Sequence, residues 1–452
     1  MEEKILLDKP DFSSLDKASL FQKMEDTEAS VISNYITSVT EPQYLFWDKV
    51  QYKNPPPEFN ALEGWYLVKQ FRKFSSKPTL ILSENNLPFY FNRRNSDDEH
   101  LHRIDMLLGG HLITPHSSVV EENRQKFLRR GLVEEAIASS QLEGAATTRS
   151  VAKQMILEQR EPRNHSEVMI INNYRAMQLL EEDYAQRPLS IDLLFELHRV
   201  LTKDDNEIAV DERGRFRRNE DEIIVTNRSK NKVAHVPPNE DFLKREINRL
   251  ISYANDEDGN FTHPIIKAIL LHFWFGYLHP FTDGNGRTAR AIFYWYLLRR
   301  GYPSILYFPI STVIKKSPTQ YAQAFIYSEQ DDNDLTYFVD YHLRKILQAI
   351  EEFEQHIDKI LEKNKKIDAL VKKDAELNDR QKQVLHFLLS EARDAYTTVQ
   401  THMAANGISR ITAQKDLKEL EALGYLASKK VSTFRRYLIT NKLTHGDQDS
   451  SE

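Results

Sequence analysis

The chain has 452 residues, of which 67 are acidic and 61 basic, and its formal net charge is -6. With 40% hydrophobic residues, this length predicts several globular domains with buried cores and excludes a disordered chain. The chain has no cysteine, which excludes disulfides, thiolate zinc sites, iron–sulfur clusters and a cysteine nucleophile. No stretch resembles a signal peptide or approaches the roughly 20 apolar residues of a membrane helix, so we expect a cytoplasmic protein with no membrane partner.

The N-terminal region, residues 1–110, has a mixed pattern for which no function is predicted. Its clearest feature is a strand-like run at 78–83 (PTLILS). From 111 to 335 the apolar spacing becomes mainly helical, so we expect a mainly α core. The helical patterns before its central part lie at 122–139, 151–159, 167–182, 190–202 and 239–253.

Two short β-branched runs interrupt the helical pattern. Residues 222–226 (EIIVT) and 232–236 (KVAHV) are separated by a polar turn and followed by two prolines. Runs of this length around a polar turn predict a β-hairpin that stands off the helical body.

Two strongly apolar helices are predicted after the hairpin. Pro264 suits the first position of a helix, and residues 265–278 are apolar almost all round, as in a helix buried on every side. Residues 288–300 (TARAIFYWYLLRR) predict a second such helix, ending before Gly301. Between the two helices lies the segment 279–286 (HPFTDGNG).

The C-terminal part of the chain differs in charge from the rest. Residues 336–376 predict a long, charged helical linker, and the segment 377–440 has ten Lys and Arg against six Asp and Glu, a net charge of +4. This segment contains three short helical patterns and two alternating runs, at 380–390, 397–404, 409–423, 425–428 and 434–439. The last residues, 441–452, are polar and predict a disordered tail.

The segment between the two apolar helices has the composition of an anion site. Gly284 and Gly286 allow a ligand to approach the backbone N–H groups at the start of the second helix, and a helix N-terminus attracts negative charge. Arg287 and Arg290 are three residues apart and share one helix face. Both guanidinium groups can therefore reach the same oligophosphate.

Two more side chains beside this turn indicate phosphate chemistry. Asp283 is a suitable ligand for Mg²⁺ next to phosphates, and His279 could act as a base. Each residue taken alone also has an ordinary structural interpretation, because Asp-Gly and Asn-Gly are common turns and a single His is usually a packed core residue. A dinucleotide-type reading of 284–289 (GNGRTA) fails, because a helix rather than a strand precedes it.

The whole string from His279 to Arg290, HPFTDGNGRTAR, closely resembles the signature H-x-F-x-[DE]-G-N-G-R-x-x-R of the Fic (Fido-fold) family, and every defined position is filled. Residues 214–217 (GRFR), ahead of the predicted hairpin, resemble the G-x-[FY]-R lead into the flap of that family. The similarity covers roughly residues 111–335. It implies a mainly helical Fic core in which the hairpin is the flap.

The resemblance implies transfer of AMP from ATP to a Ser, Thr or Tyr hydroxyl of a target protein, or of the protein itself, with release of pyrophosphate. His279 would be the catalytic base, Asp283 would bind Mg²⁺, and a homodimer would be in keeping with the family. The residues implied to bind ATP and its phosphates are Gly284, Asn285, Gly286, Arg287, Thr288, Arg290 and Tyr321. The flap residues beside nucleotide and target would be Ile223, Ile224, Val225 and Thr226.

Residues 139–144 (SSQLEG) resemble the inhibitory motif [ST]-x-x-x-E-[GN], which some members carry on a helix before the core. By this resemblance Glu143 and Ser139, on a helix near 132–144, would hold Arg290 away from the γ-phosphate and keep the enzyme autoinhibited. In some relatives the same glutamate aligns a water molecule that removes AMP from a modified protein. De-AMPylation is therefore an alternative on the same fold.

The helices and hairpin of 377–440 resemble a winged helix-turn-helix domain. Its third helix would enter the DNA major groove, and the hairpin would form a basic wing. The residues expected on the exposed face of that helix are Arg410, Gln414, Lys415 and Lys418. DNA is therefore a candidate partner, and a DNA-binding transcriptional regulator whose Fic core senses nucleotide is an alternative function. Winged helices also bind proteins or pack domains together.

Overall fold

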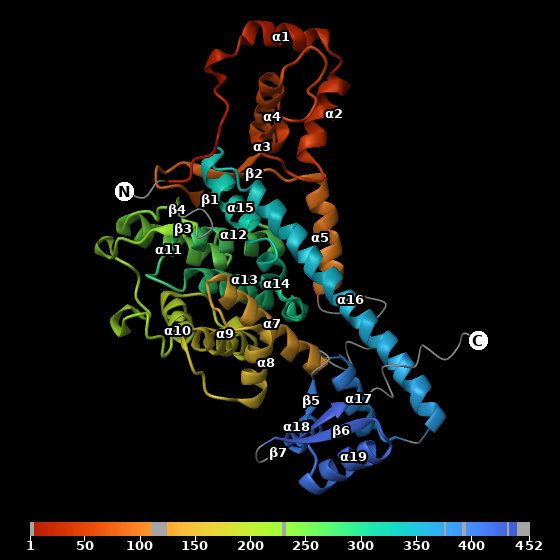
Figure 1. The fold of residues 1–452 in the computed structure, drawn as a ribbon. Coiled ribbons are helices and arrows are strands. Elements are labelled where there is room, and N and C mark those ends of the chain that lie inside the picture. Colours follow the sequence, from red (N-terminus) through yellow and green to blue (C-terminus); the bar gives the residue numbers. More distant parts are fainter. Residues whose placement is uncertain are drawn as a thin grey trace, which may run out of the picture. The chain divides into compact units, whose positions relative to one another are not determined.

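The computed structural model describes residues 4–109, 124–227, 232–374, 377–390, 395–431 and 434–440. The chain forms two compact units, residues 1–351 and 352–452. Most described residues are helical, as the sequence predicts, and the described strands form small sheets (Figure 1). The predicted tail at 441–452, residues 111–123 and the hairpin turn at 228–231 lie outside the described residues.

The N-terminal region consists of helices and a hairpin. Its elements are η1 (Phe12–Ser14), α1 (Lys17–Asp26), α2 (Ala29–Thr40), α3 (Trp47–Val50), α4 (Ala61–Ser75), β1 (Lys77–Leu82), β2 (Pro88–Phe91) and α5 (Asn95–Leu108). The strand-like run at 78–83 corresponds to β1. This region packs on the start of α16 (Thr336–Asp374), where the rings of Tyr44 and Tyr337 meet edge to face and Arg94 pairs with Asp340. The structure therefore has no unit boundary at 110, because these buried contacts join the region to the core.

The remaining elements of the first unit are helices, short 3-10 turns and one hairpin. The helices are α7 (Arg124–Leu142), α8 (Arg149–Glu158), α9 (His165–Glu182), α10 (Ile191–Leu201), α11 (Glu240–Ala254), α12 (Pro264–Leu278), α13 (Asn285–Arg299), α14 (Ile310–Lys315) and α15 (Pro318–Gln330). The 3-10 turns are η2 (Tyr184–Gln186), η3 (Val210–Glu212), η4 (Asn219–Asp221) and η5 (Pro303–Tyr307). Helices α14 and α15 are not predicted from the sequence, because they begin close to prolines and carry only short apolar patterns.

Helices α12 and α13 are the most deeply buried helices around the loop and lie in the core of the first unit (Figure 1). Nearly every side chain of α12 is buried, and α13 buries Tyr294, Trp295 and Tyr296. Aromatic side chains bury large areas and dominate core energetics. The two helices therefore form a packed base for the loop that joins them.

The hairpin is present as β3 (Val225–Asn227) and β4 (Lys232–His235), which pair antiparallel. Its first strand begins later than predicted, because Glu222 adopts a left-handed φ of 46° after η4 and interrupts the extended backbone. Of the expected flap residues, Val225 and Thr226 lie in β3, whereas Ile223 and Ile224 precede it.

The second unit is a small helical domain with a three-stranded sheet. Its elements are the C-terminal part of α16, α17 (Asp379–Ser390), β5 (Tyr396–Thr397), α18 (Val399–Asn406), α19 (Arg410–Ala422), β6 (Leu426–Val431) and β7 (Phe434–Ile439). Strand β7 lies between β5 and β6. Leu385, Leu417, Leu420 and Tyr425 are buried together in its core. The three helices and the hairpin predicted for this segment are present, and the resemblance to a winged helix stays a prediction.

The outer face of α19 is polar and basic. Arg410, Gln414, Lys415 and Lys418 are all exposed, as expected from the sequence. Ile411 is 80% exposed on the same helix. Exposed basic residues beside an apolar side chain are the groups that a DNA major groove can contact.

Candidate active site

The loop between α12 and α13 begins and ends in left-handed backbone. His279 ends α12 with φ 46°, and Gly284 precedes α13 with φ 77°. The first N–H groups of α13 have no acceptor within the helix, and no side chain caps them. The positive end of the helix dipole adds to these donors. This backbone arrangement is suited to binding an anion.

His279 is neutral in this environment. Its Nδ1 lies 3.4 Å from the carbonyl oxygen of Gly276; because a carbonyl only accepts, we assign the ring proton to Nδ1 and the lone pair to Nε2. Burial, with smaller contributions from the charges of His235 and Arg217, lowers the pKa of His279 to about 3. A neutral imidazole with an accessible lone pair is the state that a general base needs.

Asn285 and Phe281 hold the shape of the loop. Asn285 Oδ1 accepts from the N–H of Phe281 at 2.9 Å, and Asn285 Nδ2 donates to the carbonyl oxygen of Phe281 at 2.8 Å. The buried Phe281 ring stacks on His198, with centroids 3.8 Å apart. The amide side chain of Asn285 is therefore engaged within the loop, which leaves its backbone N–H as the group that could bind an anion.

Arg217, the last residue of the GRFR segment, joins the lead into the hairpin to the same loop. Its backbone N–H donates to Pro280 O at 2.8 Å, and its Nε donates to His279 O at 2.8 Å. Its Nη2 also donates to the carbonyl oxygens of Leu278 and Pro238. The contacts with Leu278 O and His279 O satisfy carbonyl groups at the C-terminal end of α12, which have no partner within the helix.

Arg287 is buried beside Asp283. Its Nη1 donates to Leu201 O at 3.0 Å, whereas its Nε and Nη2 have no hydrogen-bond partner. Nη2 lies 3.5 Å from Asp283 Oδ2. Unsatisfied buried donors at this position are compatible with an anion in the loop, so phosphate binding by Arg287 stays a prediction.

The structure does not support the expected contact between Thr288 and ATP. Thr288 is fully buried. Its backbone N–H and its hydroxyl both donate to the carbonyl oxygen of Gly284, at 2.9 and 2.8 Å. Because both donors stabilise the first turn of α13, neither is available to a ligand.

Arg290 is held by the SSQLEG segment. Its Nε donates to Ser139 Oγ at 2.8 Å, and its Nη2 donates to Ser139 O at 3.0 Å and Glu143 Oε1 at 2.6 Å. A Cβ added to Gly286 would lie 2.1 Å from Glu143 Oε1. The Glu143 carboxylate therefore lies directly against the first turn of α13, beside the anion site, and neutralises Arg290.

The middle of α7, the helix that leads to Glu143, is firmly anchored. A Cβ added to Gly131 would lie 1.8 Å from Leu306 O, so α7 and η5 are in backbone contact. The buried Glu135 carboxylate accepts from the Tyr294 hydroxyl at 2.8 Å and from the N–H of Ser311 at 3.0 Å. Burial raises the pKa of Glu135. These contacts fix the register of α7 against α13 and α14.

Tyr321 lies next to Arg290. Its hydroxyl is 2.9 Å from Nε2 of the buried His272 and also interacts with Arg290. Burial raises the pKa of Tyr321 to about 12 and lowers the pKa of His272 well below its usual value. The hydroxyl thus accepts from Arg290 and shares a hydrogen bond with His272. Binding of ATP by Tyr321 stays a prediction.

Asp283 has the properties of a Mg²⁺ ligand. Its side chain is 57% exposed, and carboxylate oxygen suits this hard cation. Among the described residues, no group of three or more His, Asp or Glu could hold a metal ion by itself. Mg²⁺ at Asp283 would therefore need further oxygens from phosphates and water, which is how nucleotide sites usually hold it.

His198 is a residue of the site that the sequence analysis missed. This fully buried side chain of α10 accepts the N–H of Gly214 on Nδ1 at 2.9 Å, and its Nε2 donates to Asp283 O at 3.0 Å. Burial lowers the pKa of His198 to about 4, so the ring is neutral. A single histidine in an apolar helix gives no sequence signal for such distant backbone contacts.

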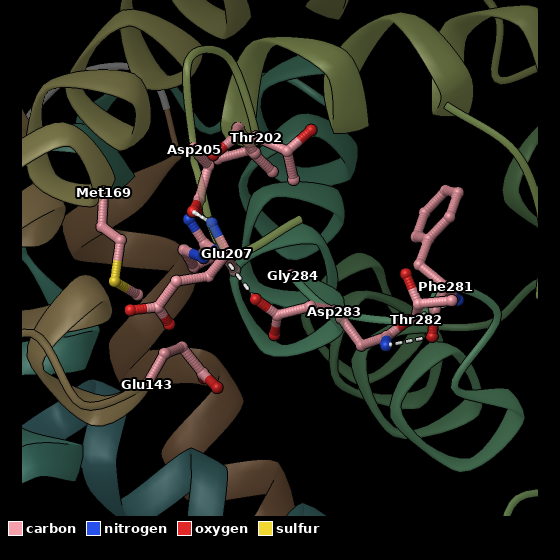
Figure 2. A network of polar contacts seen from close by, with 12 residues as sticks. Glu143, Met169, Thr202, Asp205, Glu207, Phe281, Thr282, Asp283 and Gly284 are labelled. Carbon is pink, nitrogen blue, oxygen red and sulfur yellow. Dashed lines mark hydrogen bonds and ion pairs between the residues drawn. The ribbon is translucent and has the colours of Figure 1, made fainter. Parts of the chain in front are cut away.

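Two cavities share Glu207, a residue that the sequence pattern does not single out, and one of them reaches the loop at Thr282 and Asp283. One, of about 550 Å³, is lined by Glu143 and His165 among others. The second, of about 280 Å³, is lined by Ile223 and Asp283 among others. Figure 2 shows Glu207 between Glu143 and Asp283. The site therefore opens both toward the SSQLEG segment and toward the flap.

The fold and the loop together define a helical domain with an uncapped helix start, a buried neutral histidine and an adjoining hairpin. Residues 188–297 match the family model described as the Fic/DOC family. This segment is therefore similar to the Fic/DOC family, as the resemblance implied.

Curated relatives share this domain. A protein adenylyltransferase Fic from Nematostella vectensis is 30% identical over 192 residues, which cover 42% of this chain and 38% of the relative. A protein of the same name from Drosophila melanogaster is 31% identical over 163 residues, covering 36% of this chain and 30% of the relative. The chain thus spans less than half the length of these relatives.

A solved structure confirms the fold. The crystal structure of a Fic family protein from Desulfovibrio desulfuricans G20 superposes with a TM-score of 0.50 at 20% sequence identity. The match covers 77% of this chain and 97% of that one. In the part of the chain that the structure describes, no helix has the length and apolar character needed to cross a membrane.

Proposed function

We propose that the protein transfers AMP from ATP to a Ser, Thr or Tyr hydroxyl of a target protein, or of itself, and releases pyrophosphate. The observation that carries the proposal is the convergence of His279, the uncapped start of α13 and Arg290 on one anion site. The relatives named protein adenylyltransferase support it.

In the proposed reaction, the hydroxyl oxygen attacks the α-phosphorus of ATP. The bond between that phosphorus and the oxygen bridging to the β-phosphate breaks, and the hydroxyl proton passes to His279 Nε2. Because burial keeps His279 neutral, the lone pair is available at ordinary pH. A positioned base of this kind contributes about 10²–10⁴-fold to the rate.

The phosphates would be held by backbone N–H groups at Gly284, Asn285 and Gly286, with Arg290 and Arg287 as cationic partners. This use of a helix start and two arginines follows from the charge of an oligophosphate. Mg²⁺ bound by Asp283 would neutralise part of the phosphate charge during transfer.

The contacts of Arg290 support autoinhibition. While Ser139 and Glu143 accept from the Arg290 guanidinium, these donors cannot bind the γ-phosphate. The Glu143 carboxylate also places negative charge against Gly286, where it repels phosphate oxygens. Removing Glu143 should therefore allow ATP to bind in a productive orientation.

The test uses wild type, Glu143→Gly and Glu143→Gly/His279→Ala proteins with Mg²⁺ and ATP labelled at the α-phosphate. We expect at least about tenfold more label on protein with Glu143→Gly than with wild type, and its loss in the double variant while ATP binding persists. ATP labelled at the γ-phosphate should give no labelled protein, which separates AMP transfer from phosphorylation. Full labelling without His279 would contradict its role as base.

The position of Glu143 supports a second candidate, removal of AMP. Its carboxylate lines the cavity of about 550 Å³, where it could align a water molecule for attack on an AMP ester. Wild type should then release AMP from protein labelled by Glu143→Gly, and Glu143→Gly should not. If no variant is labelled while ATP binding is intact, AMP removal or nucleotide sensing becomes the better hypothesis for the function.

We further propose that the second unit binds duplex DNA through α19 and the β6–β7 hairpin. Lys429 lies directly opposite Arg436, and Lys430 opposite Arg435. Like charges directly opposite each other on a hairpin are unfavourable, and a phosphate backbone would relieve this repulsion. The exposed Ile411 offers an apolar contact for thymine methyl groups.

The DNA proposal is tested by binding of the full chain to a mixed-sequence duplex over a salt series. Lys415→Glu/Lys418→Glu should weaken binding and reduce the salt slope by about 2. Lys17→Glu/Lys53→Glu, which makes the same charge change at exposed positions of the first unit, is the control. Equal effects of the two pairs would contradict a site on α19. A homodimer and a cytoplasmic location stay predictions from the sequence.

A further inference from the structure

His198 connects three separate parts of the candidate site. Its Nδ1 accepts from Gly214, which begins the GRFR lead into the hairpin, and its Nε2 donates to the carbonyl oxygen of Asp283. Its ring also stacks on Phe281 at an interplanar angle of 15°. One imidazole on α10 thus links the flap lead, the loop backbone and the apolar anchor of the loop.

Residues at the end of α10 contact Asp283 directly and through Arg287. A Cβ added to Gly284 would lie 3.4 Å from His198 Nε2, so the imidazole lies directly against the Asp283–Gly284 backbone. On the other side, Arg287 donates to Leu201 O and places its Nη2 3.5 Å from the Asp283 carboxylate. Residues at the end of α10 therefore hold both polar groups of Asp283. His198 binds the carbonyl directly, and Leu201 holds Arg287, which contacts the carboxylate.

We propose that His198 is a positioning residue, which fixes the Asp283–Gly284 peptide and so directs the Asp283 carboxylate toward bound Mg²⁺ and ATP. The identity of these ligands rests on the proposed function. A residue that only filled space in the core would need no more than the shape of the ring. The His198 ring also accepts a hydrogen bond from one distant segment and donates one to another. Such bonds to buried backbone groups are costly to lose.

Three substitutions separate the parts of this role in the full-length Glu143→Gly protein. His198→Gln keeps an N–H donor near the position of Nε2 and so can preserve the bond to Asp283. His198→Asn keeps an acceptor near the position of Nδ1 and so can preserve the bond to Gly214 while losing the one to Asp283. His198→Phe keeps the aromatic stack and loses both bonds.

Two measurements follow for each variant. The first is the Mg²⁺ concentration that gives half-maximal ATP binding by calorimetry. The second, which needs no nucleotide, is hydrogen exchange of the backbone amides of residues 282–288. Thermal denaturation of each variant reports on the general loss of stability.

We expect His198→Asn and His198→Phe to raise the Mg²⁺ midpoint and the exchange rate of the loop by about fivefold to tenfold, the size of one lost buried hydrogen bond. His198→Gln should stay within about threefold of the parent in both. Equal shifts in all three variants, or none in His198→Phe, would overturn the positioning role and leave a structural one. If the parent binds no ATP, the proposed function fails, and the exchange rates alone still decide the role of His198.

Discussion

The reactivity of His279 depends on its protonation state, which the surrounding protein sets. Burial, with smaller contributions from His235 and Arg217, lowers the pKa of His279 to about 3. The bond from Nδ1 to Gly276 O orients the ring with Nε2 as the acceptor. Since a base must be unprotonated to act, this histidine keeps its active form well below neutral pH.

We predict that kcat/KM for AMP transfer by Glu143→Gly has no acid limb near pH 6.5, the usual pKa of histidine. Because the pKa of His279 is lowered to about 3, the neutral form is present at every pH above about 4. The measurement is the initial labelling rate from pH 5 to 8, at saturating Mg²⁺. Tryptophan fluorescence serves as the control that the protein stays folded; a midpoint near 6.5 in folded protein would contradict the assignment.

Helix α7 is fixed at its middle, and Glu143 follows directly after its last residue, Leu142. Gly131 allows backbone contact with η5, and Glu135 is bonded to α13 and α14. Glu143 lies eight positions after Glu135 in the sequence. A shift of the helix at its middle is therefore transmitted to the contact with Arg290.

We predict that Gly131→Ala weakens autoinhibition. The added Cβ would clash with Leu306 O, so α7 must move at a cost of about 1–3 kcal/mol, and Ser139 and Glu143 move with it. AMP labelling should rise above that of wild type without reaching that of Glu143→Gly. The control is Ser150→Ala, at an exposed position of α8, and labelling equal to wild type in a destabilised Gly131→Ala protein would contradict this transmission through α7.

At the scale of the whole molecule, buried neutral histidines link stability to pH. Burial lowers the pKa of His198 to about 4, and of His279 and His342 to about 3, and it lowers the pKa of His272 well below the usual value. All four belong to the first unit. In the unfolded chain they would titrate near pH 6.5.

We predict that the first unit loses stability as the pH falls from 7 to 5. The folded pKa values lie below the unfolded ones, so the unfolded chain gains protons that the native state does not, and stability present above pH 6.5 is lost. Each such histidine contributes about 1.4 kcal/mol per pH unit below 6.5. All four tryptophans lie in the first unit, so urea unfolding followed by their fluorescence reports on it alone.

A variant with one fewer buried histidine tests the cause of this acid effect. His342→Asn can keep the donor to Phe338 O that His342 Nδ1 provides. This variant should lower the slope of unfolding free energy against pH by the equivalent of up to one proton. An unchanged slope would mean that other groups cause the acid effect. The window from pH 5 to 7 lies above the usual carboxylate pKa values, so histidines dominate there.

The local features of this protein follow from its sequence. Buried apolar helices on both sides of HPFTDGNGRTAR, the hairpin after GRFR and the C-terminal helices followed from periodicity and turn residues, and the described elements match them closely. The motif residues of the loop could be named because they are contiguous. Local patterns carry this information because helix and strand periods and turn conformations depend on near neighbours in the chain.

The tertiary structure decided which of these residues face one another. Arg290 meets Glu143 across 147 positions and Asp283 meets His198 across 85, distances over which no local pattern carries a signal. It also showed that Thr288 uses both donors on Gly284 and that the N-terminal region shares its core with α16. Burial, hydrogen-bond partners and lowered pKa values depend on side chains brought together from distant segments, and packing alone sets them.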